Sequence, residues 1–144
     1  VQALGATGET GVRALFDALH RQLARTRGAA ISLACLERSG ALSWAGVGNV
    51  EAVAVAPDGK ARRLATGNGI VGQRMGPLYP QQFSLEPDTT LLWVTDGVGE
   101  DFLEDFRPLL PTASVPGWIL DRHALGSDDA LVLALRYRPG GTAP

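Results

Sequence analysis

Three short, mostly apolar runs and a fourth short segment that contains two arginines, separated by glycine-containing turns, fill the stretch from residue 29 to residue 65. Each run is too short for a stable helix, and tight turns of this kind join neighbouring strands of an antiparallel sheet. We therefore expect an antiparallel meander in this part of the chain. Its strands are predicted at residues 29–36, 42–47, 50–56 and 61–65.

Helices and further strands are predicted around this meander. Apolar residues at spacings of three and four between Val12 and Leu23 form one stripe on a helix. Two strongly apolar strands follow late in the chain, at residues 90–95 and 130–137. Runs of strands followed by helices favour an antiparallel α+β architecture over a doubly wound parallel sheet. The helices are predicted at residues 11–27, 99–110 and 115–125, and another short strand at 83–85.

The composition is that of an ordinary globular protein. The 144 residues are 45% hydrophobic and 19% charged, and the net charge of -2 gives no attraction to nucleic acid or anionic lipid. No apolar run reaches the ~20 residues that span a bilayer, and the N-terminus lacks the pattern of a signal peptide. The single cysteine, Cys35, excludes an intrachain disulfide. We expect a cytoplasmic protein whose single domain covers 1–144, with flexible segments at residues 1–10 and 139–144.

Two acidic residues mark the ends of the two late strands. Asp96 follows the first strand, and Asp128 precedes the second. If the strands are antiparallel neighbours, both carboxylates lie at one edge of the sheet, near Glu100 and Asp129. Such carboxylates repel one another unless a cation neutralises them, and Mg²⁺ or Mn²⁺ prefers oxygen ligands. Asp-Gly is also a common turn dipeptide, so spacing alone leaves open a role for both aspartates as turn residues.

Four motifs occur in a recognisable order. Residues 91–100, Leu-Leu-Trp-Val-Thr-Asp-Gly-Val-Gly-Glu, combine an apolar strand with Thr-Asp-Gly and an acid; residues 126–133, Gly-Ser-Asp-Asp-Ala-Leu-Val-Leu, combine Asp-Asp with a strand. This set resembles the metal-dependent Ser/Thr protein phosphatases, which include protein phosphatase type 2C and the stage II sporulation protein E group. Residues 26–33 and 45–50 are similar to a small bacterial subgroup that acts on stress-signalling complexes. Order and spacing agree over residues 11–137.

The resemblance implies a four-layer αββα sandwich, with two antiparallel sheets stacked face to face and helices outside. It implies that a water held between two Mn²⁺ or Mg²⁺ ions hydrolyses a phosphoserine or phosphothreonine. Asp96 and Asp128 match the family's metal-ligand positions, and Glu100 matches an acidic position that can hold a further metal. Asp129 is a candidate ligand or a supporting group, and Gly97 matches only the turn. The implied partner is a phosphorylated bacterial signalling protein, such as an anti-sigma-factor antagonist or a stress-complex scaffold.

One family motif has no counterpart. An earlier Asp-Gly, whose aspartate bridges both metals in the family, should precede the helix at residues 11–27. Residues 1–10 contain no aspartate, and Glu9 is their only acid. The chain is therefore expected either to lack the family's N-terminal strands or to be a degenerate relative. A catalytically inactive phosphatase-like domain that binds a partner is the alternative function.

Other candidate motifs are set aside. Residues 67–72 satisfy the dinucleotide pattern G-x-G-x-x-G, but no buried strand precedes them and no helix follows. His20 is expected on the solvent side of its helix, and His123 has no identifiable catalytic partner. Ser127 has no base placed to activate it.

Overall fold

The structure, a computed structural model, describes residues 8–140 of the chain. Residues 1–7 and 141–144, which include most of the segments expected to be flexible, lie outside this range. The described chain divides into two compact units, each assembled from two stretches of sequence. The first unit contains residues 8–50 and 64–84, and the second contains residues 51–63 and 85–140.

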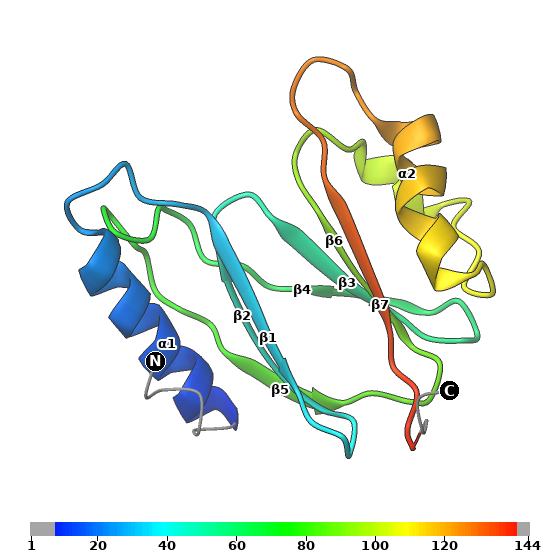
Figure 1. Cartoon of the computed structure of the whole chain (residues 1–144), viewed down its shortest axis with the longest axis horizontal. Helices are drawn as coiled ribbons and strands as arrows, with labels where there is room; N and C mark the ends of the chain where they lie inside the picture. Colours follow the sequence, from blue (N-terminus) through cyan, green and yellow to red (C-terminus); the bar gives the residue numbers. More distant parts are fainter. Residues whose placement is uncertain (1–7, 141–144) are drawn as a thin grey trace. The chain divides into compact units, whose positions relative to one another are not determined.

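The first unit is a three-stranded antiparallel sheet with one helix packed on it (Figure 1). Its elements are α1 (Gly8–Leu23), β1 (Ile31–Leu36), β2 (Ala41–Val47) and β5 (Gln81–Ser84). The strand order is β1-β2-β5. Val12 and Phe16, from the predicted apolar stripe of α1, are fully buried in one cluster with Ala45 and Val47 of β2. The stripe is therefore the face that holds α1 on the sheet.

The second unit is a four-stranded sheet covered on one face by a helix and two 3₁₀ turns (Figure 1). Its elements are β3 (Glu51–Val55), β4 (Ala61–Leu64), β6 (Thr90–Val94), η2 (Glu100–Leu103), η3 (Thr112–Ser114), α2 (Val115–His123) and β7 (Val132–Arg136). The strand order is β4-β3-β6-β7, and β6 runs antiparallel to both neighbours. Phe102 of η2 and Ile119 of α2 are fully buried in a cluster with Val53 and Leu92. This core fixes the segment that follows β6.

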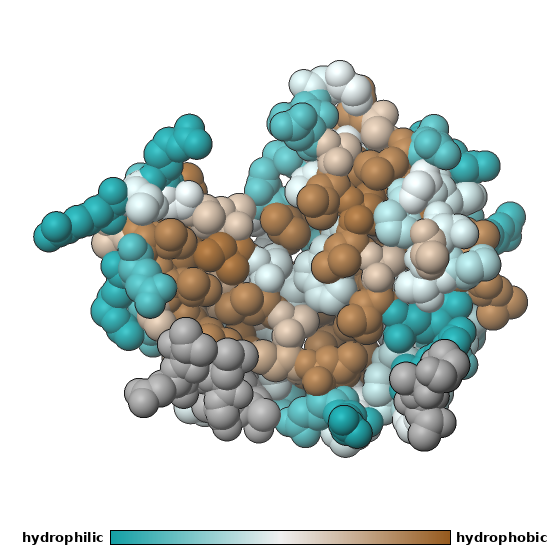
Figure 2. Space-filling model, in the orientation of Figure 1, coloured by the Kyte–Doolittle hydropathy of each residue, from teal (hydrophilic) through white to brown (hydrophobic). Residues whose placement is uncertain are grey.

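Strand β7 carries apolar side chains on both faces. Val132 and Ala134 pack against the core that α2 covers. Leu131, Leu133 and Leu135 are 58%, 55% and 39% exposed. Figure 2 shows an apolar band over β7. One face of the strand is therefore in the core, while the other presents leucines at the surface.

The predicted α+β class with two antiparallel sheets and flanking helices is confirmed, but the single meander is wrong. Strands β1 and β2 belong to one sheet, whereas β3 and β4 belong to the other. The chain changes sheet after Gly48, whose φ of 105° strongly favours glycine. A Cβ on Gly48 would lie 2.4 Å from the Cβ of Ala30, so this close approach also requires glycine.

The helices are shorter or shifted relative to the sequence expectations. Helix α1 begins at Gly8, so residues 8–10 are not a loop, and it ends at Leu23 rather than at residue 27. The Thr26 hydroxyl donates to the Leu23 carbonyl at 2.8 Å. This carbonyl, at the end of the helix, therefore needs no backbone N–H from a further helical turn. Only η2 forms within residues 99–110, and Pro108 lacks the backbone N–H that a helix continuing through this segment would use. Among the described residues, no helix has both the length and the apolar character needed to cross a bilayer.

Candidate metal site at the ends of β6 and β7

The pairing of β6 with β7 continues beyond both strands and brings two acidic segments to one sheet edge. Val94 lies opposite Val132, and the Thr95 backbone N–H donates to the Leu131 carbonyl at 3.1 Å. The Leu131 N–H in turn donates to the Thr95 hydroxyl at 2.9 Å. Asp96, which follows Thr95, therefore lies at the same edge as the start of the β7 segment. Asp128 and Asp129 belong to that start.

Gly97 allows these two segments to approach each other closely. Gly97 is buried, and a Cβ added to it would lie 2.4 Å from the Asp129 carbonyl oxygen. No real Cβ fits that distance, so any other residue would push the segments apart. The Val98 N–H donates to the Thr95 carbonyl at 3.0 Å and closes the turn around Asp96. The sequence predicts the turn but not this close approach.

The four candidate carboxylates are exposed and supply only oxygen donors. The Asp129 N–H donates to Asp128 Oδ1 at 2.8 Å, which fixes the orientation of the Asp128 carboxylate. Oxygen donors suit Mg²⁺ or Mn²⁺. Within residues 8–140, however, no three His, Cys, Asp or Glu side chains gather closely enough to hold an ion. The candidate residues within 8–140 therefore offer oxygen donors of the kind that Mg²⁺ or Mn²⁺ prefers, but they do not form a complete metal site. These residues are Asp96, Glu100, Asp128 and Asp129.

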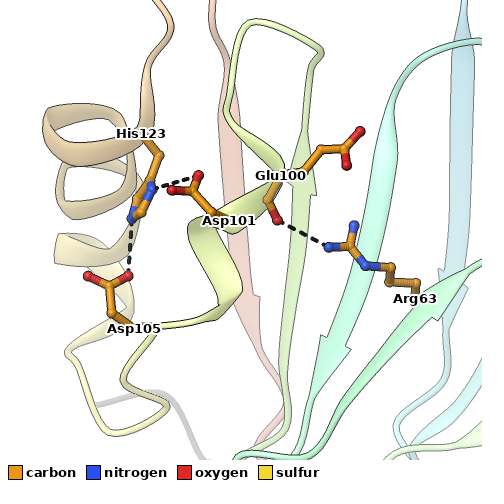
Figure 3. A network of polar contacts seen from close by, with 5 residues as sticks. All are labelled: Arg63, Glu100, Asp101, Asp105 and His123. Atoms are coloured by element: carbon orange, nitrogen blue, oxygen red, sulfur yellow. Dashed lines mark hydrogen bonds and ion pairs between the residues drawn. The ribbon is translucent and has the colours of Figure 1, made fainter.

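Glu100 is held by its backbone rather than by its side chain. Arg63 of β4 donates from Nη2 to the Glu100 carbonyl at 3.2 Å and also pairs with Glu51 of β3. In Figure 3 the Glu100 carboxylate points away from His123 and Asp101. The backbone of Glu100, the first residue of η2, is thus hydrogen-bonded to β4, while its carboxylate stays exposed.

His123 forms the most elaborate polar contact of this region (Figure 3). Its Nδ1 lies 3.2 Å from Asp101 Oδ1, and its Nε2 lies 3.1 Å from Asp105 Oδ1. The His123 side chain is 9% exposed, against 65% and 53% for the two aspartates. Carboxylates only accept, so both contacts are hydrogen bonds when both ring nitrogens carry protons. The His123 ring therefore lies between two carboxylates and can bridge them.

The expectation that His123 lacks a partner is incomplete, since it has two structural partners although neither forms a catalytic triad. Backbone hydrogen bonds also join the end of α2 and the residues after it to the turn that follows Asp96. The Gly99 N–H donates to the His123 carbonyl at 2.8 Å, and the Leu125 N–H donates to the Gly97 carbonyl at 2.9 Å. The end of α2 thus holds the loop that carries two candidate ligands. The acids at positions 101 and 105 gave no sequence signal for this, because only the fold brings residue 123 beside them.

His20 also differs from expectation. The Gly72 N–H donates to His20 Nδ1 at 3.0 Å, so this ring fastens a loop of the first unit to α1 and is not simply solvated. The next element after residues 67–72 is the strand β5, whereas a dinucleotide motif would open a helix.

Comparisons with known proteins agree with this fold. The model of the stage II sporulation protein E (SpoIIE) family matches residues 2–115, a range that includes Asp96, Gly97 and Glu100 and ends before Asp128. No curated protein sequence gives a significant match.

Several solved structures are similar. A chain of the bacterial stressosome, described as a modular system adapted to control secondary messenger signalling, is 25% identical with a TM-score of 0.71, covering 87% of this chain and 67% of that one. RsbX in complex with magnesium is 16% identical with a TM-score of 0.74, covering 88% and 65%. The phosphatase domain of SpoIIE from Bacillus subtilis is 12% identical with a TM-score of 0.65, covering 92% and 67%.

The last two likenesses are too distant in sequence to show more than a shared fold. The chain spans about two thirds of the length of each of these three solved chains. Because the family model matches most of its residues, the chain belongs to the stage II sporulation protein E family of phosphatases.

Proposed function

We propose that this chain carries part of the active site of a metal-dependent phosphatase that hydrolyses phosphoserine or phosphothreonine on a bacterial signalling protein. The observation that carries the proposal is the meeting of the Asp96 and Asp128 segments at one sheet edge, with Gly97 against the Asp129 backbone. Family membership supplies the reaction class. The similarity to a stressosome chain favours a stress-signalling protein as the partner.

The proposed roles follow from the contacts of each residue. Asp96 and Asp128 would be the main ligands of Mn²⁺ or Mg²⁺, with Glu100 and Asp129 as further candidates. When bound, two such ions lower the pKa of a water and offset charge on the phosphoryl oxygens. The Asp129 N–H orients one oxygen of Asp128 and leaves the other available as a ligand. Gly97 sets the separation of the two acidic segments, and the end of α2 keeps their loop in place.

The alternative is a phosphatase-like domain that binds a partner without hydrolysis. The observation behind it is that residues 8–140 contain no group of three possible metal ligands. Calorimetric titration with Mn²⁺ separates the two functions. Tight binding of two ions by the full-length protein supports hydrolysis, whereas no binding supports the inactive alternative.

Activity is tested with Mn²⁺-dependent hydrolysis of p-nitrophenyl phosphate by the full-length protein. Asp96→Asn should lower kcat by about two orders of magnitude, because a lost ligand removes several kcal/mol of charge stabilisation. Asp121→Asn, which changes an exposed aspartate of α2, is the matched control and should keep full activity. Undiminished turnover in Asp96→Asn would contradict the proposed role.

A further inference from the structure

A cleft lies in the first unit, which does not contain the acidic edge. Its volume is about 640 Å³, and three loops line it: residues 27–30, 48–49 and 68–70. Ligand clefts in proteins commonly measure roughly 300–1,000 Å³. The cleft is therefore large enough for a short peptide segment, and the candidate metal site does not account for it.

Backbone hydrogen bonds between the loops hold the cleft in shape. Ala29 and Val71 exchange two of them, at 3.0 and 2.9 Å. The Gly48 N–H donates to the Gly67 carbonyl at 3.0 Å, and the Asn68 carbonyl accepts from Gly76 at 2.9 Å. Each loop is thus fixed to another part of the first unit. A preformed cleft loses little conformational entropy when a ligand enters.

Small residues form much of the lining and leave the main chain accessible. Residues 28–30 are Gly-Ala-Ala, and glycines occupy positions 48 and 69. A Cβ on Gly28 would lie 2.5 Å from the Val71 carbonyl oxygen, so the walls depend on the absence of a side chain there. Walls of small residues suit an extended peptide, whose own backbone can approach closely.

The charge of the cleft is positive. Arg27 is exposed and is the one charged side chain among the lining residues. No aspartate or glutamate occurs in residues 18–36 or 64–85. The described part of the first unit has six arginines against three acids, whereas that of the second has seven basic residues against twelve acids. A negatively charged segment would therefore be attracted to the first unit and repelled by the acidic second unit.

We propose that this cleft docks an extended, negatively charged segment of the phosphoprotein substrate, with the Arg27 guanidinium recognising its charge. The inference rests on the proposed function for the identity of the substrate. The cleft itself contributes affinity and selectivity, while hydrolysis belongs to the acidic edge of β6 and β7. Arg27 is thus a specificity determinant and takes no part in the chemical step.

The kinetic test compares three substrates of the full-length protein with Mn²⁺. They are an octapeptide with a central phosphoserine flanked by glutamates, its lysine-flanked counterpart, and p-nitrophenyl phosphate. We expect the acidic peptide to have a kcat/KM about tenfold above that of the lysine peptide, an effect typical of one charge-assisted contact. Arg27→Glu should remove this preference by raising KM, and should leave p-nitrophenyl phosphate hydrolysis unchanged.

Arg13→Glu is the matched control, since Arg13 is an exposed arginine of the same unit outside the cleft. It should retain the preference for the acidic peptide. A wild-type protein with no preference, or equal losses in Arg27→Glu and Arg13→Glu, would overturn the docking role. Thermal melts of both variants confirm that they are folded.

A binding measurement separates failure of docking from failure of the proposed function. Fluorescence anisotropy follows a fluorescein-labelled acidic peptide without the phosphoryl group, so no hydrolysis is needed. Loss of binding in Arg27→Glu supports the docking role of the cleft, whether or not the protein hydrolyses p-nitrophenyl phosphate. If binding is lost in this variant and the wild type hydrolyses no p-nitrophenyl phosphate, only the proposed phosphatase activity is rejected. Equal binding by wild type and Arg27→Glu rejects the cleft whatever the activity.

Discussion

Replacing His123 with alanine tests whether the end of α2 holds the acidic loop in place. The substitution removes the contacts to Asp101 and Asp105 and the packing of a ring whose centroid lies 5.9 Å from that of Trp118. Because both aspartates are more than half exposed, each of these polar contacts contributes only about 0.5 kcal/mol. The nearly buried ring adds a comparable packing term, so we expect unfolding to become easier by about 2 kcal/mol.

Urea unfolding measures this loss, with tryptophan fluorescence as the signal. A double-mutant cycle of His123→Ala with Asp101→Asn isolates the coupling between the two side chains, and a second cycle does so for Asp105→Asn. Asp121→Asn is the control, because it changes an aspartate two residues away that forms neither contact. Mn²⁺ affinity should fall about tenfold in His123→Ala, as expected when a group that supports metal ligands is removed.

The coupling energies decide whether the interpretation of His123 is right. Values near zero in both cycles would show that the ring does not bind the two aspartates in solution. A large loss of stability with unchanged Mn²⁺ affinity would show that His123 supports the core but not the candidate metal site. Either result refutes the role assigned to this residue.

Three further predictions concern other parts of the second unit. Gly97→Ala should destabilise the protein by about 1–3 kcal/mol and weaken Mn²⁺ binding, because its Cβ would press on the Asp129 carbonyl; unchanged urea midpoints would contradict this. Phe102→Ala should cost about 3–5 kcal/mol in the same assay, since the ring is fully buried. The hydrogen bond from the Lys60 side chain lowers the pKa of the Asp58 carboxyl from 3.8, so the pair stabilises the fold above that pH and this contribution is lost as pH falls through the lowered value. In Lys60→Ala, an NMR titration should show the Asp58 pKa returning toward 3.8.

The sequence predicts the features that depend on local pattern. The period of the apolar residues gave the buried face of α1, and the abrupt stop at Asp96 marked the end of β6. The meeting of the Asp96 and Asp128 segments followed from assuming that two apolar strands are antiparallel neighbours, which the register of β6 and β7 bears out. Their role as metal ligands stays a prediction.

The features that the sequence did not predict depend on contacts between distant residues. At the change of sheet, Gly48 lies so close to Ala30 that no Cβ fits there, and no local pattern reveals this close approach. The partners of His123 lie 18 and 22 residues away and were assigned to a helix that does not form. Tertiary packing overrides the local signal in both cases.

The interleaving of the two units in the sequence has a consequence for biosynthesis. The polypeptide passes from one unit to the other three times, after residues 50, 63 and 84. Among residues 8–140, the strands of the first unit are all present once β5 has been made, whereas the β3–β4 hairpin must wait for β6 and β7, which are made later. During synthesis this hairpin is therefore a two-stranded segment without its central partner, and such hairpins are only marginally stable in water. The ribosome thus completes the strands of the unit with the docking cleft before the acidic edge of β6 and β7 can form. Cleavage of the chain at a single position cannot separate the two units.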